Sequence, residues 1–383
     1  MNNRRGILFS VLVIVLAVAL SGCNLVRVNE EKDRKLVVAK VNGIEILKGE
    51  VLDQYHASYG DTEEYDKEIL LRILDGLIEE ELVWQKAEAA GHVINEEILN
   101  RAEQDYEQAI REYGEFLKGM AQEDAESEED YEQQAREMME EYIKESGQTE
   151  EEYLELLGKY IAIQDYFSEL TADLQIEDEE IDEYYQEELE FQKNSPSLAA
   201  QYSKVEIVTE PASRLVKHIL IKIADEDTQA ISSLRQENKA EEADALREEK
   251  LEVIRDNAQK VLDKAKSGED FEGLIDQYGE DPGMELEDYK DGYFMLRDEG
   301  MMEEFVEASF QLQEGEISDL VATDYGYHII KVYEAKEDKI ASLEDVKEDI
   351  RTELLNRKKS DKINELIKQW LEEAEVKKFE NRL

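Results

Sequence analysis

Cysteine is almost absent from this sequence, since Cys23 is the only one among 383 residues. A single thiol cannot form a disulfide within the chain, so Cys23 requires an explanation other than cross-linking. The length leaves room for two or three domains, at roughly 150 residues per domain.

Proline is nearly as scarce, with three residues in the chain and none before Pro196. The sequence from Lys48 to about Glu190 therefore lacks the residue that most often interrupts a helix. Thr149–Glu152 has the pattern of a capping box at a helix start. Apolar residues recur at helical spacing in this region, for example at Leu70, Ile73, Leu74, Leu77 and Ile78.

Positive charge is in short supply: 45 Lys and Arg stand against 97 Asp and Glu, giving a formal charge of −52. Such a surface repels phosphate backbones, so nucleic acid is excluded as an expected partner. The acids are spread along the chain, which favours a role in solubility over steering of cationic ligands. The densest acidic stretch, 121–134, lacks the central glycine and alternating ligands of a calcium loop, so we expect no metal and no cofactor.

The N-terminus carries the only long apolar run. Arg4 and Arg5 precede a fourteen-residue apolar run, Ile7–Leu20, interrupted only by Ser10, and then "LSGC", which ends at Cys23. Fourteen helical residues span about 21 Å, short of the ~30 Å hydrocarbon core, so an export signal over residues 1–22 is favoured over a membrane span. "LSGC" resembles the lipobox of bacterial lipoproteins. That resemblance implies cleavage before Cys23, lipidation of Cys23 and an extracytoplasmic chain anchored to the cell membrane.

Two changes of pattern follow a short polar tether, 23–35. Leu36–Leu47 alternates apolar and polar residues around Asn42-Gly43, which predicts a tight β-hairpin. Between Phe191 and Glu226 two prolines appear and β-branched residues become frequent, which predicts a boundary near residue 210.

The pattern after this boundary predicts strand, helix, helix, loop, helix, strand. The first strand, Arg214–Ile223, carries His218 and leads into a long charged helix whose later part, Leu251–Lys266, is amphipathic. Its earlier part, Asp225–Lys250, is interpreted as a solvated helix extension. Shorter helices are expected after Asp270 and over Glu303–Leu312.

The closing strand carries His328. Alternation places Tyr327, Ile329 and Lys331 on one face and His328, Ile330 and Val332 on the other, which predicts a half-buried strand. A lone histidine on such a face more often packs in a core than takes part in chemistry, so His328 alone indicates no site.

The tail restarts a helix, with Ser342–Asp345 as its cap. It carries a continuous apolar stripe that requires a partner surface. The stripe consists of Ile363, Leu366, Ile367, Trp370 and Leu371.

Three segments in the second half resemble the parvulin family of peptidyl-prolyl isomerases. They are "VKHILIKI" from Val216, "DFEGLIDQYGEDPG" from Asp270 and "EEFVEASFQLQEGEISDLVATDYGYHIIKV" from Glu303, in the order found in the family. The resemblance implies that the first and last strands lie side by side at the sheet centre, each with one histidine. This supplies a partner for His328 and favours an active-site role.

The resemblance also implies the site residues. His218, Asp281, Thr323 and His328 match the polar catalytic network, and Phe294, Met301 and Phe305 match the proline pocket. Phe310 is interpreted as ordinary helix packing.

This chain departs from the family before the pocket phenylalanine. Parvulins usually have a "GGDLGWF"-like stretch there, whereas this chain has "EDYKDGYF", with Asp291 where a pocket leucine is expected. The departure predicts modest activity and an increase on Asp291→Leu.

The remaining segments resemble the extracytoplasmic foldases of the PrsA type and, more distantly, SurA-type chaperones. They include "VAKVNGIEILKGEV" from Val38, "TEEEYLELL" from Thr149, "IEDEEIDEYYQEE" from Ile176 and the tail helix. The implied fold class is α+β: a helical chaperone domain from N-terminal residues 36–209 and C-terminal residues 339–383, with an inserted parvulin-like lobe, 210–338. The lobe would have a small antiparallel or mixed sheet flanked by helices.

The implied function is a membrane-anchored foldase that isomerises X-Pro bonds in newly exported, unfolded polypeptides. A holdase chaperone with a degenerate parvulin domain is the alternative. A ligand-binding lipoprotein is disfavoured, because repeated α/β units would be expected. The oligomeric state is left open, with a dimer as one option.

Overall fold

The chain is described by a computed structural model that covers residues 30–60, 65–120, 128–145, 148–286, 289–298 and 300–383. Cys23, the predicted signal segment and residues 121–127 of the acidic stretch lie outside the described residues. The chain divides into two compact units: residues up to Leu174 with Lys359–Leu383, and Gln175–Lys358. The domain limits predicted from the sequence stay predictions.

The first unit combines a small sheet with long helices. Its sheet has the order β2-β1-β9 and is antiparallel. Its elements are α2 (Glu30–Arg34), β1 (Val37–Val41), β2 (Ile44–Leu47), α3 (Lys48–Tyr59), α4 (Lys67–Ala89), α5 (Glu96–Met120), α6 (Glu128–Glu145), α7 (Glu150–Leu170) and β9 (Val376–Lys378), followed by a 3-10 turn, Glu380–Arg382.

The predicted hairpin and helix start are confirmed in this unit. Strands β1 and β2 pair around Asn42 and Gly43, whose φ values of 51° and 94° are those a tight turn of this kind needs. Thr149 and Glu152 form the predicted capping box at the start of α7.

The apolar stripe of the tail has a partner surface. Trp370 is buried among side chains of α4 and α7, and its ring stacks on Tyr166 with centroids 5.9 Å apart. Leu366, Ile367 and Leu371 pack against the same core. The last turns of the chain therefore complete the core of the first unit, as the stripe predicted.

The second unit contains a four-stranded antiparallel sheet with the order β5-β4-β7-β6 and a two-stranded ribbon of β3 and β8. Helix α14 (Leu343–Glu373) begins in this unit and ends in the other. The remaining elements are α8 (Asp178–Asn194), α9 (Pro196–Tyr202), β3 (Val208–Glu210), β4 (Ser213–Lys222), α10 (Asp225–Gln236), α11 (Ala240–Lys266), α12 (Phe271–Tyr278), a 3-10 turn (Pro282–Glu285), β5 (Tyr293–Met295), α13 (Glu303–Gln311), β6 (Val321–Thr323), β7 (Gly326–Lys336) and β8 (Lys339–Ile340).

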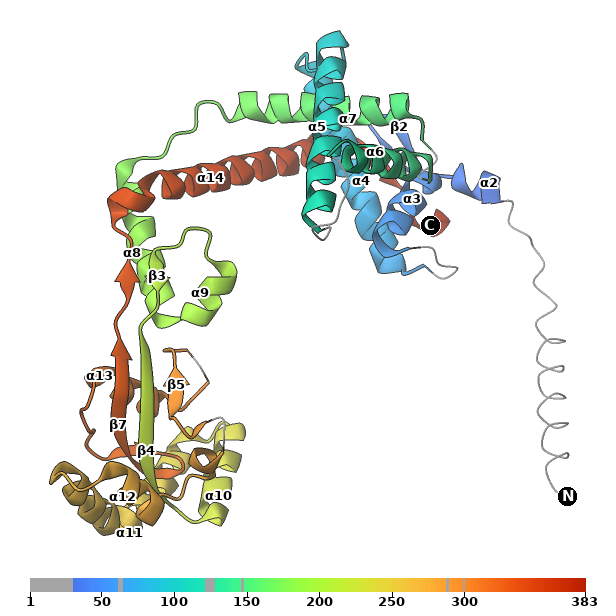
Figure 1. Cartoon of the computed structure of the whole chain (residues 1–383). Helices are drawn as coiled ribbons and strands as arrows, with labels where there is room; N and C mark the ends of the chain where they lie inside the picture. Colours follow the sequence, from blue (N-terminus) through green and yellow to red (C-terminus); the bar gives the residue numbers. More distant parts are fainter. Residues whose placement is uncertain (1–29, 61–64, 121–127, 146–147, 287–288, 299) are drawn as a thin grey trace, which may run out of the picture. The chain divides into compact units, whose positions relative to one another are not determined.

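The two central strands, β4 and β7, lie side by side along their length (Figure 1). One face packs on α11 and α12 through Ile219 and Ile329, and the other packs on α13 through Ile330 and Val332. The predicted alternation of the closing strand is confirmed, since His328, Ile330 and Val332 are buried on one face while Tyr327 and Lys331 on the other are only partly buried. The strand is more buried than predicted at Ile329, which has no exposed surface because helices cover both faces.

The charged segment after β4 also differs from its prediction. It forms two helices, α10 and α11, rather than one, and the chain between them passes through Asn238 at a φ of 56°. Ile231 and Ala243 have no exposed surface and form a small core with Ile223 and Leu251. The segment is therefore packed against the sheet, not a solvated extension.

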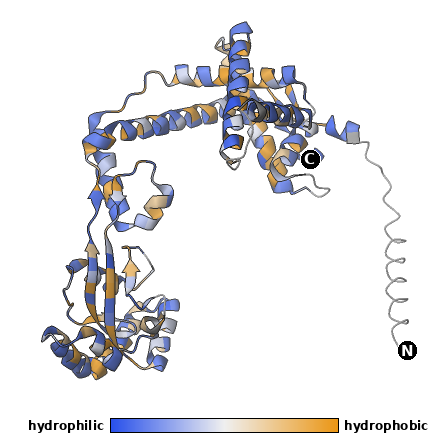
Figure 2. Cartoon of the chain, viewed as in Figure 1, coloured by the Kyte–Doolittle hydropathy of each residue, from blue (hydrophilic) through white to orange (hydrophobic). Residues whose placement is uncertain are grey.

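The molecule is an α+β protein in which long helices and small antiparallel sheets form the two units, as predicted. Most of the helical ribbon is hydrophilic, with hydrophobic residues at intervals along the long helices (Figure 2). Within the part of the chain that the structure describes, no helix has the length and hydropathy needed to span a bilayer.

Candidate active site

Two histidines meet on one face of the central strand pair. Strands β4 and β7 are antiparallel, with Leu220 opposite His328 and Ile330 opposite His218, so the histidines are diagonal neighbours. Their Nδ1 atoms are 2.9 Å apart and their rings stack at 5.0 Å. Both side chains are buried.

The other two predicted polar residues extend this pair at each end. Asp281 Oδ2 lies 2.8 Å from His218 Nε2, and Thr323 Oγ1 lies 2.8 Å from His328 Nε2. Asp281 follows α12, and Thr323 ends β6. Four residues from separate parts of the sequence thus form one continuous hydrogen-bonded chain.

The partners determine the direction of each bond when both imidazoles are neutral. The Tyr325 N–H donates to Thr323 Oγ1 over 3.1 Å, which leaves the threonine hydroxyl to donate to His328 Nε2. His328 Nδ1–H then donates to His218 Nδ1, and His218 Nε2–H donates to the Asp281 carboxylate. Every polar side-chain atom of these four residues therefore has a hydrogen-bond partner, and the negative charge lies at the Asp281 end.

Burial and hydrogen bonding set the charges. Burial, together with a smaller effect of the neighbouring His218, lowers the pKa of His328 to about 3, so His328 is neutral near pH 7. Burial would raise the pKa of Asp281, but hydrogen bonds from His218, Tyr293 and the Gly283 N–H hold it well below its usual range. Burial and the Asp281 charge raise the pKa of Tyr293, whose hydroxyl donates to Asp281 over 2.8 Å.

A cavity of about 390 Å³ opens beside this chain. Its apolar lining includes Leu220, Met301, Met302 and Phe305, and both histidines line it. The Phe305 ring meets the two imidazoles edge-on, at 5.1 and 5.2 Å between centroids. An apolar wall therefore faces the middle of the polar chain, a combination that suits an apolar ring attached to a polar amide.

One wall of the cavity is anchored from a distance in the sequence. Asp298, two residues before the lining residue Gly300, accepts hydrogen bonds from the N–H groups of Ser197 and Leu198 at the start of α9. It thereby satisfies donors that the first turn of a helix leaves free. The segment before the sheet thus helps to hold the part of the cavity wall that contains Met301 and Met302.

Two sequence predictions about the pocket were wrong. Phe294 does not line the cavity and is 58% exposed, whereas its neighbour Tyr293 lines it, because adjacent side chains of β5 point to opposite faces. Asp291 is exposed and is not part of the lining, so it does not occupy the place of a pocket leucine. Phe310 packs in the core, as predicted.

Several lining residues were missed by the sequence reasoning. The alternation of β5 could have indicated Tyr293, since Tyr293 and Phe294 cannot both face the cavity. Tyr325 follows the matched Thr323 by two residues, which was a usable signal. The other missed lining residues are Leu220, Lys222, Pro282, Gly300 and Met302.

Comparison with known proteins agrees with this geometry. Residues 200–336 match the PPIC-type PPIase domain. The foldase protein PrsA of Clostridium botulinum strain Hall is 26% identical over 98% of each chain. The chain is thus similar to PrsA-type foldases over nearly its whole length, and residues 200–336 match the parvulin-type isomerase family. Residues 200–336 are therefore a parvulin-type isomerase domain.

Other PrsA-type proteins have similar coverage. The foldase protein PrsA of Clostridium perfringens is 26% identical over 100% of this chain and 98% of its own. The crystal structure of PrsA from Bacillus subtilis is 21% identical, with 88% of this chain and 93% of that chain covered and a TM-score of 0.23.

Proposed function

We propose that this PrsA-type chain catalyses cis–trans isomerisation of X-Pro bonds at the cavity beside His218 and His328. The observation that carries the proposal is the continuous chain Asp281–His218–His328–Thr323 along an apolar cavity. Rotation about a peptide bond has a barrier of about 18–20 kcal/mol, and each 1.36 kcal/mol removed is a tenfold increase in rate.

The proposed mechanism requires no covalent intermediate. Met301 and Phe305 would hold the proline ring, which places the amide beside the imidazoles. A planar amide is more polar than a twisted one because conjugation separates charge, so a site that is neutral and poor in water favours the twisted form. The neutral His328 suits that task, and Asp281 and Thr323 would hold the two rings in position.

A peptide assay tests this proposal. X-Pro isomerisation takes tens to hundreds of seconds unaided, so acceleration by the mature chain is measured directly on a proline-containing peptide. We expect modest acceleration that a peptide occupying the proline pocket inhibits. A mature chain that folds but produces no acceleration would overturn the proposal.

A holdase role is the second candidate, and exposed apolar side chains of the first unit favour it. Phe116, Met120 and Tyr142, on α5 and α6, are 57%, 70% and 60% exposed. Such side chains suit weak binding of unfolded polypeptides. Suppression of client aggregation by the mature chain, with no effect on proline isomerisation, would favour this role over catalysis.

We also propose that the chain is exported and lipid-anchored through Cys23 on the outer face of a bacterial cytoplasmic membrane. The "LSGC" sequence after a short apolar run supports this proposal. Labelling of cells with a radioactive fatty acid should mark the wild type and not Cys23→Ala. Equal labelling of the two would contradict it.

A further inference from the structure

The charged helices α10 and α11 reach the strands that carry the site. Ile231 and Ala243 pack in a core that also contacts Ala322 of β6 and Tyr327 of β7. These two residues lie directly beside Thr323 and His328 in the sequence. The helices therefore support the strands beside Thr323 and His328, a role that the sequence did not indicate.

Arg235 of α10 is joined to the turn that follows Thr323. Its Nε and one terminal nitrogen lie 3.1 and 3.0 Å from the two oxygens of Asp324, which is a bidentate pair. The same terminal nitrogen donates to Asp244 over 2.6 Å. The Asp324 side chain is only 17% exposed. Partly buried, forked pairs of this kind hold geometry far better than single surface ion pairs.

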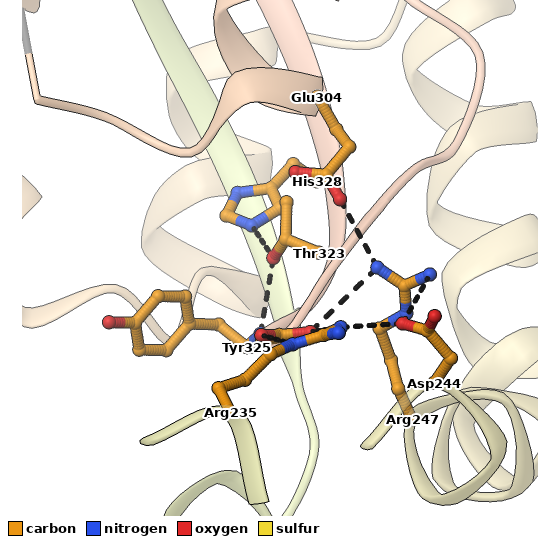
Figure 3. Close-up of polar contacts among 8 residues, drawn as sticks. Arg235, Asp244, Arg247, Glu304, Thr323, Tyr325 and His328 are labelled. Atoms are coloured by element: carbon orange, nitrogen blue, oxygen red, sulfur yellow. Dashed lines mark hydrogen bonds and ion pairs between the residues drawn. The ribbon is translucent and has the colours of Figure 1, made fainter. Parts of the chain in front are cut away.

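Arg247 of α11 extends these ion pairs to the start of α13, which carries Phe305 of the apolar cavity lining. It lies 3.1 Å from Glu304 and 3.8 Å from Asp324, and it shares Asp244 with Arg235 at 3.6 Å. Glu304 precedes Phe305, whose ring contacts both imidazoles. The two arginines therefore reach both the Thr323 turn and the start of α13 (Figure 3).

The orientation of Asp324 is coupled to the site through its two neighbours. On one side Thr323 Oγ1 bonds His328, and on the other the Tyr325 N–H donates to the same Oγ1. The Tyr325 carbonyl accepts from the Ile223 N–H over 3.0 Å, and the Tyr325 side chain lines the cavity. A change in the Asp324 carboxylate would therefore move the hydroxyl that fixes the ring nitrogens of His328.

We propose that Arg235, assisted by Arg247, is a positioning residue that holds the Thr323–Tyr325 turn so that the Thr323 hydroxyl stays on His328 Nε2. This inference rests on the proposed isomerase function for its kinetic consequence. Its structural consequence, the state of His328, is measured independently of activity.

Arg235→Met in the mature chain is the test. The fork is lost while the length and packing of the side chain are largely kept. We expect kcat/KM for a proline peptide to fall on the order of tenfold, since small displacements at a site carry large rate effects. Arg235→Lys keeps the charge without the fork and should give an intermediate rate.

Histidine-selective ¹⁵N labelling supplies the second readout, because the chain has only four histidines. In the wild type His328 should show an unprotonated Nε2 and a protonated Nδ1. In Arg235→Met these two signals should shift toward each other as the tautomers mix. A loss of packing that leaves Thr323 on His328 would not move them.

Arg255→Met is the matched control. Arg255 lies on α11, as Arg247 does; within the part of the chain that the structure describes it pairs only with Glu252, at 3.4 Å, and its side chain is 62% exposed. The kcat/KM of Arg255→Met on the proline peptide should stay within about twofold of wild type. Such a change is too small to indicate that a group of the site has been displaced. A folded Arg235→Met with wild-type rate and wild-type His328 signals overturns the proposal, and so does an equal loss of rate in Arg255→Met.

Asp324→Asn keeps the proposal testable if Arg235→Met does not fold. It removes the charge of the fork with little change of shape, and we expect the same shift of the His328 signals. If the wild type has no isomerase activity, the proposed function fails, while the His328 signals of these variants still decide the positioning role.

Discussion

His328 shows how one residue can serve both the site and the stability of the fold. It lies between a hydroxyl and a second imidazole, and burial keeps it neutral by lowering its pKa to about 3. An unfolded chain returns it to an ordinary pKa near 6.5. Acid therefore protonates His328 in the unfolded chain first, and this favours unfolding.

The first prediction concerns the effect of His328 on stability as pH falls. Between pH 6.5 and about 3 the unfolded state binds one more proton at His328, so its contribution to stability is complete above pH 6.5 and is lost as pH falls. From pH 6.5 to 5 the wild type should lose about 2 kcal/mol more unfolding free energy than His328→Gln. The pKa of Asp281 is depressed in the folded chain. Its contribution to stability is therefore lost only below its unfolded pKa near 3.9, outside the range from pH 6.5 to 5. Urea unfolding of both proteins at the two pH values measures the difference, and equal pH dependence would contradict it.

The second prediction concerns the anion at the end of the chain. Asp281→Asn keeps the shape but removes the charge that orients His218 and accepts from Tyr293. We expect kcat/KM on a proline peptide to fall on the order of a hundredfold, as for loss of one preorganised electrostatic group. Asp291→Asn is the control, because Asp291 is exposed and outside the cavity lining. Equal effects of the two substitutions would argue against a role for Asp281 in orienting His218.

At the scale of elements, the site depends on close contact between β4 and β7. Gly326 begins β7 at a φ of 149° and pairs with Lys222. A Cβ built there would lie 2.1 Å from the Ile221 carbonyl oxygen, so no side chain fits without separating the strands. Glycine at this position therefore sets the pairing that brings the two histidines together.

Gly326→Ala should consequently destabilise the second unit by more than the ~1–2 kcal/mol that an unfavourable φ alone costs. Gly315→Ala is the matched variant, because Gly315 has a φ of 86° with no atom within 4 Å of an added Cβ. Hydrogen exchange of β4 and β7 amides measures the effect in this unit. Equal acceleration of exchange in both variants would show that strain, not the clash, dominates.

At the scale of the whole molecule, the isomerase domain begins and ends at one place. Strands β3 and β8 pair antiparallel, with Glu210 opposite Lys339, so the two chain segments that enter and leave the domain are adjacent. An insertion with adjacent ends can be removed without stretching the flanking chain. This pairing is compatible with an inserted domain, and its predicted limits, 210–338, stay a prediction.

The fourth prediction uses this geometry. Replacing residues 211–338 by Asn-Gly should close β3 and β8 into a hairpin, since that pair favours a two-residue turn. We expect the shortened chain to lose isomerase activity and to keep suppression of client aggregation. Full-length His328→Ala is the comparison, because it should lose the same activity with the domain still present. A shortened chain that is helical but no longer suppresses aggregation would contradict an independent chaperone role for the helices.

Much of this architecture follows from local sequence. Asn42-Gly43 specifies its turn and Thr149 with Glu152 its helix start, because the interactions involve residues within four positions of each other. The order of three motifs was enough to indicate the parvulin-type domain and to single out His218, Asp281, Thr323 and His328. The distances among these four residues, in contrast, came only from the paired strands.

What the sequence by itself determined is the list of elements and the chemistry available to them, since helix period, turn residues and motif order are properties of neighbouring positions. The tertiary structure decided which side chains share a cavity. Tyr293 rather than Phe294 faces the histidines because β5 pairs with β4 in one register, and a shift of one residue reverses every side chain. Likewise Arg235 meets Asp324 across 89 positions because α10 packs on the sheet, and no local pattern encodes a contact at that separation.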